Sequence, residues 1–190
     1  EGNTILTSKE IDNISYRHFL SGNISKYFRS FKTTLSLNAN YNTQNLEQFL
    51  NNQLGNVKND GWILGSKINT NPLDWLSLEY NGKLFTNKSQ INSLKNPIIK
   101  TWNHSISMNI YPHKNHYIRF TTDYYNNDFT NQKQETLFSD LVYRFTFPNT
   151  KIDLEASWNN VFNTKYYTNS SIDSYYYYVQ KITLRPSQIF

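Results

Sequence analysis

The stretch of sequence that decides the fold reads Leu76-Ser77-Leu78-Glu79-Tyr80-Asn81-Gly82-Lys83-Leu84. Apolar and polar residues alternate in it, and successive side chains of a β-strand point to opposite faces. Six further segments between Phe31 and Asn163 show the same alternation, strongly or weakly. A slip of one residue would exchange the two faces of any segment, so repeated agreement predicts strands that each have one apolar and one polar face.

The connections between these segments alternate in length as well. Short links fall near residues 27–32, 71–74, 111–116 and 148–151, and three of the four contain proline. Long polar links fall at residues 42–61, 86–98, 126–135 and 164–174. Barrels of the bacterial outer membrane have short periplasmic turns and longer extracellular loops. The sequence therefore predicts an all-β fold of antiparallel transmembrane β-barrel strands, arranged as an up-and-down meander.

Composition agrees with a barrel wall. Only 37% of residues are hydrophobic and the mean hydropathy is −0.70, as expected when half of each strand faces a wet lumen. No apolar run reaches the roughly 18 residues of a transmembrane helix. No signal peptide is visible at the N-terminus, so we expect that it was cleaved or that the natural chain begins further upstream.

Aromatic residues gather near both ends of the segments. Rings at both borders of a lipid-facing band form the interfacial girdle of a membrane barrel. The alternative is that they fill the core of a soluble β-sandwich, but sandwiches seldom keep such regular short and long connections. The predicted girdle residues are Trp62, Trp75, Trp102, Tyr111, Tyr124, Phe147 and Trp158.

The net charge of +5 and the pI near 9.2 raise the question of nucleic-acid binding. Positive and negative residues are mixed along the polar faces, which argues against a nucleic-acid partner. We expect ion pairs between side chains on the wall of a lumen. We favour the interpretation that these charges stabilise the wall, rather than that they bind a substrate. Basic residues in the outer loops are candidates to meet lipopolysaccharide phosphates. The candidate lumen-lining residues are Lys67, Glu79, Lys83, Arg119, Asp123, Asp140, Arg144, Asp153 and Glu155.

No enzyme motif is present. The sequence has no glycine-rich phosphate loop, no nucleophile elbow and no HExxH pattern. His113 and His116 share one short link and are candidates for weak metal binding, although such a pair is usually only solvated. We therefore predict no catalytic activity, no resident metal and no cofactor.

A motif lies towards the end of the chain. Asn160-Val161-Phe162-Asn163 precedes Lys165 and Tyr166, and Leu184-Arg185-Pro186-Ser187-Gln188 follows. This combination resembles the last strands of Bacteroidota-type TonB-dependent outer-membrane receptors, the SusC-like superfamily. The resemblance implies a barrel of about 22 strands closed by an N-terminal plug and energised by the TonB system. It also implies pairing with a SusD-like surface lipoprotein when the cargo is a glycan.

The strand count sets a limit on what these residues can form. About nine strands are expected: one near residues 14–28, the seven alternating segments and a last one near residues 175–185. An odd number leaves the first and last strands parallel, so an antiparallel barrel cannot close on them alone. We expect residues 1–190 to be a C-terminal section of a larger barrel, trimmed at both ends. The plug and the remaining strands would come from the same protein or from another chain.

Three functions remain open at this point. The favoured one is the wall of a TonB-dependent transporter that takes up a glycan, peptide, siderophore or vitamin. The second is a barrel subunit without transport activity, accessory to an outer-membrane assembly or secretion complex. The third and least favoured is a soluble β-rich binding protein.

Overall fold

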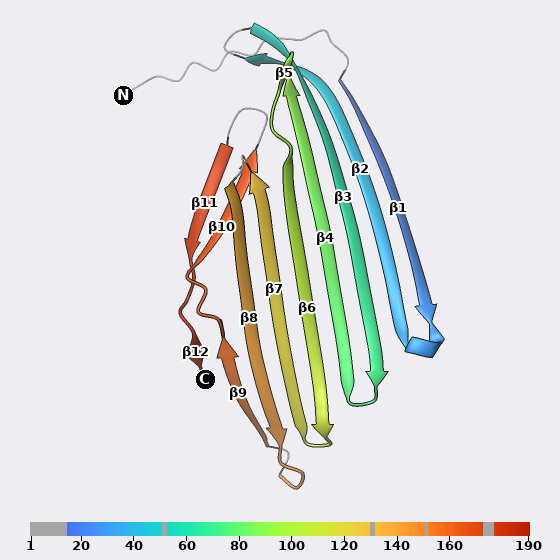
Figure 1. The fold of residues 1–190 in the computed structure, drawn as a ribbon, viewed down its shortest axis with the longest axis vertical. Helices are drawn as coiled ribbons and strands as arrows, with labels where there is room; N and C mark the ends of the chain where they lie inside the picture. The colour runs from blue at the N-terminus through green and yellow to red at the C-terminus, as the bar shows by residue number, and fades with distance from the viewer. Residues whose placement is uncertain (1–14, 51–52, 130–131, 151, 173–176) are drawn as a thin grey trace.

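The protein is built almost entirely of β-strands. The computed structural model describes residues 15–50, 53–129, 132–150, 152–172 and 177–190 (Figure 1). One short 3-10 helix, η1, follows the first strand. The elements are β1 (Tyr16–Phe28), η1 (Arg29–Phe31), β2 (Thr33–Leu50), β3 (Gln53–Leu73), β4 (Leu76–Ile91), β5 (Leu94–Lys95), β6 (Ile99–His113), β7 (His116–Phe129), β8 (Gln132–Thr146), β9 (Asp153–Asn159), β10 (Tyr166–Ile172), β11 (Tyr177–Thr183) and β12 (Gln188–Ile189).

Most of the strands form one curved layer. The order in the sheet is β1-β2-β3-β4-β6-β7-β8-β9-β12, with β5 attached to β4, and the paired strands run antiparallel. The prediction of an all-β, antiparallel, up-and-down meander is therefore confirmed. The sheet is open, because β1 and β12 stand at opposite ends of the order (Figure 1).

The links between strands lie at two opposite ends of the sheet. The four short links gather at the lower end of Figure 1, as predicted, and Lys151 of the last link lies outside the described residues. The long links are shorter than predicted, because the strands continue into them. β2 runs to Leu50 and β3 starts at Gln53, within the stretch predicted as a loop. Residues 51–52, 130–131 and 173–176 of these links are outside the described part.

The prediction for the last strand of the wall was wrong. Residues 175–185 were expected to add the last strand, but β11 pairs with β10 in a separate two-stranded sheet. The strand that pairs with β9 is β12, in which Gln188 lies opposite Asn159. Hydrogen bonds between the main chains of Ser157 and Phe190 extend this ladder. The polar link at residues 164–174 thus opens a hairpin, and the chain returns to the sheet only after it.

Side chains opposite each other in neighbouring strands share a face, so the register shows which residues of successive strands make up each face. One rung joins Thr33, Thr70, Leu78, Met108 and Phe120 in turn. The same register aligns the polar residues on the other side. The alternation read within single segments is therefore kept in step from β2 to β8.

The sheet has hardly any core. Among the described residues, the buried hydrophobic side chains are Val57, Ile99 and Val142. Large apolar side chains remain exposed instead, with Trp62 44% and Trp102 40% accessible. A soluble sandwich would bury such residues beneath a second sheet.

The short turns advance along the strands from one hairpin to the next. On the rung described above, Thr33 is the first residue of β2, Leu78 the third of β4 and Phe120 the fifth of β7. These are the second, fourth and sixth strands in the sheet order, so the turns shift by one residue per strand. With a rise of about 3.4 Å per residue and about 4.8 Å between strands, this shift corresponds to a strand tilt of about 35°. Barrel strands are tilted by similar angles.

A tyrosine covers a glycine at the centre of the apolar face. A Cβ atom at Gly82 would clash with the hydroxyl of Tyr80, so the phenol ring occupies the space above that residue. The same hydroxyl is hydrogen-bonded to Nδ1 of His104 at 2.8 Å. Trp102 stacks against the His104 ring with centroids 5.8 Å apart. The hydroxyl of Tyr80 and the imidazole of His104 thus satisfy each other.

We predict that Tyr80→Phe destabilises the sheet by about 1–2 kcal/mol, because Nδ1 of His104 loses its partner in apolar surroundings. Unfolding of the purified protein by urea or heat measures the change. Tyr80→Phe should have almost no effect when His104 is already leucine. An equal loss in both backgrounds would show that the hydrogen bond contributes nothing.

Candidate functional site

The polar face carries all the predicted lumen-lining charges. Lys83, Asn103 and Tyr125 share one rung, and Thr121 and Asp140 lie opposite each other on another. The rungs place most of the charged candidates opposite serine, threonine or asparagine, whereas Arg119 is also opposite Val142 and Asp123 is also opposite Phe138. The candidates on this face are Lys67, Glu79, Lys83, Arg119, Asp123, Asp140, Arg144, Asp153 and Glu155.

The charges interact less with each other than we expected. Lys67 and Glu79 form an ion pair at 2.8 Å, with both side chains about half exposed. Arg144 lies opposite Glu155 in register, but its guanidinium is placed over the ring of Tyr117, 5.0 Å from the centroid. Among the described residues, Lys67–Glu79 is the one ion pair within the candidate set. Exposed pairs of this kind contribute at most about 1 kcal/mol each, so the face is polar rather than tightly cross-linked.

The predicted girdle residues are distributed over both ends of the sheet. Trp62, Trp102, Tyr124 and Trp158 are on the apolar face by register. Tyr41 packs on Trp62 with ring centroids 4.6 Å apart, at the long-link end.

Three girdle candidates lie at the short-turn end. Phe147 packs edge-on against Phe145, which is opposite Leu154 in register. Trp75 is in the turn between β3 and β4. The ring of Tyr111 contacts Tyr117, so it is on the polar side of the sheet.

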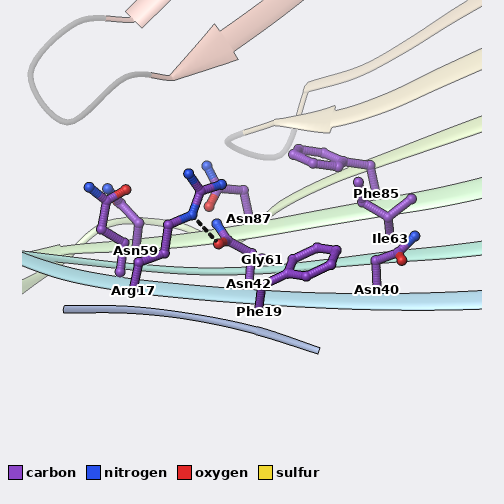
Figure 2. Close-up of a pocket in the computed structure, with 10 residues that line it drawn as sticks. Arg17, Phe19, Asn40, Asn42, Asn59, Gly61, Ile63, Phe85 and Asn87 are labelled. Atoms are coloured by element: carbon purple, nitrogen blue, oxygen red, sulfur yellow. Dashed lines mark hydrogen bonds between the residues drawn. The ribbon is translucent and has the colours of Figure 1, made fainter. Parts of the chain in front are cut away.

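A hollow in the polar face lies near the long-link end of β1 to β4 (Figure 2). Its volume is about 360 Å³. Nε of Arg17 donates a hydrogen bond of 2.8 Å to Oδ1 of Asn42 at its edge. The lining residues are Arg17, Phe19, Asn40, Asn42, Gln44, Asn59, Gly61, Ile63, Phe85 and Asn87.

The register explains why the surface is hollow here. Gly61 lies between Asn42 on β2 and Asn87 on β4, and it has no side chain to fill the rung. A Cβ atom at this position would meet only ordinary contacts, the nearest being the carbonyl oxygen of Thr86 at 3.5 Å. The backbone there is an ordinary strand, so nothing in its conformation requires glycine. The absence of a side chain at this position leaves room for a ligand.

The lining defines what the hollow can bind. Carboxamides both donate and accept hydrogen bonds, and a guanidinium donates only. Figure 2 shows Arg17 and Asn59 at one end and Ile63 and Phe85 at the other. No carboxylate is among the lining residues. The hollow therefore suits a neutral or anionic polar solute that also has an apolar part.

The sequence analysis missed this hollow, because it considered only charged residues. A signal was available in the amides at alternate positions of β2, namely Asn38, Asn40, Asn42 and Gln44. Residues at alternate positions share a face. The contribution of Gly61, in contrast, depends on the register between β2 and β3, which no local pattern supplies.

The asparagines of the Asn160–Asn163 motif hold the base of the β10–β11 hairpin. The side-chain amide of Asn160 donates to the carbonyl oxygens of Thr164 and Arg185, at 2.9 and 2.8 Å. Its Oδ1 accepts from the Thr164 amide, and its own main-chain amide donates to Asp140. Asn163 accepts a weaker bond of 3.2 Å from the amide of Ser187. One side chain thus joins the strands entering and leaving the hairpin.

Both asparagines adopt a left-handed backbone conformation, with φ of 52°. Asparagine is tolerated there better than other residues that have a side chain. The hairpin then lies beside β7 and β8, where Tyr167 packs against Tyr125 and Phe138 with centroids 5.5 and 5.8 Å apart.

The histidine pair provides no metal centre of usual composition. His113 and His116 face each other with ring centroids 6.1 Å apart. In the part of the chain that the structure describes, no group of three potential ligands is close enough to hold a metal ion.

No helix among the described residues has the length and apolar character needed to cross a membrane.

Comparisons with known proteins returned no relatives. No family model, no curated protein and no solved structure matches this chain.

We predict that Asn160→Gly destabilises the region around the hairpin by about 2–3 kcal/mol, because three side-chain hydrogen bonds are lost while the left-handed backbone remains favourable. Asn163→Gly is the matched control, since it loses a single longer bond. Hydrogen exchange of the Thr164 and Arg185 region measures the local loss. Equal protection in the two variants would contradict the role given to Asn160.

Proposed function

We propose that this chain forms part of the wall of a transmembrane β-barrel in the bacterial outer membrane. The observation that carries the proposal is a single sheet whose broad apolar face is uncovered. In water such a face would favour aggregation. In a membrane the same face contacts lipid, and the polar face lines an aqueous lumen.

The dimensions of the apolar face support this proposal. On β4 the face runs from Leu76 to Leu84, which is about 27 Å along the strand or about 22 Å along the axis of a barrel tilted by 35°. The apolar band of outer-membrane barrels is about 25 Å tall. Trp62 and Trp102 mark its border at the long-link end. We assign that end to the extracellular side and the short turns to the periplasm.

The free edges of the sheet support a larger assembly. Among the described residues, no strand pairs with the outer edge of β1, which is 13 residues long. Unpaired main-chain groups cannot remain exposed to hydrocarbon, so other strands must cover this edge. We propose that the remaining strands and a plug come from the rest of the same protein or from another chain.

We further propose that the barrel takes up a nutrient with energy from the TonB system. The resemblance of the Asn160–Asn163 segment to TonB-dependent receptors supports this assignment. The hollow at Gly61 supports it independently, because it opens on the polar face near the proposed extracellular end. A solute entering from outside would meet its amides and Arg17 first. A SusD-like lipoprotein would cover this end if the solute is a glycan.

The two faces can be tested with single cysteines, since the sequence contains none. Along β6 we expect a membrane-impermeant maleimide to label Ser105→Cys and Ser107→Cys, which face the lumen. It should not label Ile106→Cys and Met108→Cys, which face lipid. The complete protein is labelled in outer-membrane vesicles, and unfolding in detergent should make all four positions reactive. Equal labelling of all four in intact vesicles would refute the membrane assignment.

The hollow can be tested by filling it. We expect Gly61→Phe to lower uptake of the transported solute by about tenfold or more, because the added ring fills the hollow and the solute loses its contacts with the lining residues. Gly61→Ala should be nearly neutral, since its methyl group fits without a clash. Gly22→Phe on the other face is the size-matched control, because nothing lies within 4 Å of that position.

Uptake is measured in cells carrying the complete protein, with neutral oligosaccharides, peptides, ferric chelates and corrinoids supplied singly. At least one class should respond to Gly61→Phe alone. Unchanged uptake of every transported class would exclude the hollow from the path.

A further inference from the structure

We propose that the apolar face binds one molecule of a bisphosphorylated outer-leaflet glycolipid, the lipid A part of lipopolysaccharide. Lys88 and Lys100 would hold its phosphates, and a hollow beside Gly82 would take one of its acyl chains. This inference rests on the proposed function, because it assumes that the apolar face contacts lipid.

The hollow is a depression of about 250 Å³ in the apolar face. Ser66 and Gly82 are opposite each other in register, and both are small, although the end of the Tyr80 side chain lies over Gly82. Larger side chains surround them, namely Leu37, Leu64, Leu84 and Trp102. The polar groups at the edge, Tyr80 and His104, are bonded to each other. The lining therefore suits a hydrocarbon chain.

Two exposed lysines lie on the same face, further towards the long links. Lys100 is opposite Thr86, and Lys88 is two residues further along β4. This diagonal arrangement separates their Cβ atoms by about 7–8 Å. Both lie beyond Trp62 and Trp102, where the headgroups of lipids adjoin an aromatic border. Lys58 and Lys95 add positive charge to the same rim.

The lysines are available for an anion. From residue 53 to residue 113, all of which the structure describes, the one carboxylate on this face is Asp60. It already accepts a bond of 2.6 Å from Oγ1 of Thr43 and pairs with Lys58 at 3.6 Å. Asp60 is opposite Lys88 in register and Asp128 is opposite Lys100, but within the described chain neither lysine forms an ion pair. A phosphate would therefore not have to displace an ion pair of either lysine.

The two features are spaced as one lipid requires. Gly82 is four residues from Thr86, so the part of the hollow at Gly82 lies about 14 Å below Lys100 along the strand. One leaflet contributes about 15 Å to the hydrocarbon core, which places the hollow alongside acyl chains whose headgroups are at the lysines. The long-link end is the proposed extracellular side, where the leaflet consists of lipopolysaccharide. Two lysines match two phosphates better than the single phosphate of a phospholipid.

The test uses the complete barrel protein, purified from outer membranes, delipidated in detergent and titrated with bisphosphorylated lipid A. Each lysine should contribute about fivefold to the affinity, so Lys88→Gln with Lys100→Gln should weaken binding by about 25-fold. Lys67→Gln is the matched control, because it removes the same charge from the opposite face of β3 and Lys67 does not line the hollow. Ser66→Leu fills the hollow and should weaken binding of lipid A severalfold, but not of its deacylated headgroup.

Each possible outcome decides the proposal. Dephosphorylated lipid A should bind the wild type as weakly as intact lipid A binds the double lysine variant. Equal losses in the double variant and in Lys67→Gln would overturn the site. Binding of phosphatidylglycerol as tight as that of lipid A would overturn the choice of lipid.

If the cysteine labelling places β6 in lipid and the lysine variants still bind normally, only this site fails. If the labelling shows no lipid-facing side, the proposed function fails with it. Resistance to unfolding by detergent on a gel confirms that each variant is folded.

Discussion

The structure depends on one constraint, the fixed register of an antiparallel ladder whose side chains alternate with a period of two. A rung such as Leu78, Met108 and Phe120 is apolar because the register places the apolar positions of each strand opposite the apolar positions of its neighbour. A slip of one residue between β4 and β6 would place Met108 among the charged residues of the other face. Both hollows arise from the same register, since it places Gly61 between Asn42 and Asn87 and Gly82 opposite Ser66. The two faces and their cavities therefore have one common cause.

Much of the fold could be predicted from local pattern alone. The alternation in single segments identifies which side chains share a face, and it placed Lys83 and Asp123 on the polar face and Leu84 and Trp102 on the apolar one. The prolines and short polar stretches located the turns at one end. These features are encoded within a few neighbouring residues. The membrane, the lumen and the transported solute are not encoded in this way, and they remain proposals.

What could not be predicted depends on contacts between distant residues. Polar residues on both sides of Leu50 and Gln53 look like a loop, but they extend β2 and β3 because the ladder there satisfies the main chain. Residues 164–174 look like a polar link and residues 175–185 look like a strand of the main sheet, but β10 and β11 pair with each other in a separate hairpin whose base is held by the hydrogen bonds of Asn160 to Thr164 and Arg185. The hollow at Gly61 requires the register of three strands to be known together. In the sequence, the amide residues that line this hollow look like ordinary polar strand residues. Only the register shows that they lie around Gly61.

The regular shift of the short turns has a consequence for the size of the proposed pore. A shift of one residue per strand fixes how steeply the strands lean, but it leaves the circumference undetermined, because any number of strands can be added at the same inclination. The radius of curvature is therefore not a property of these nine strands alone. The neighbours that join the free edge of β1 would determine the diameter, and with it the largest solute that can pass, while the wall described here keeps the same slope in any of these assemblies.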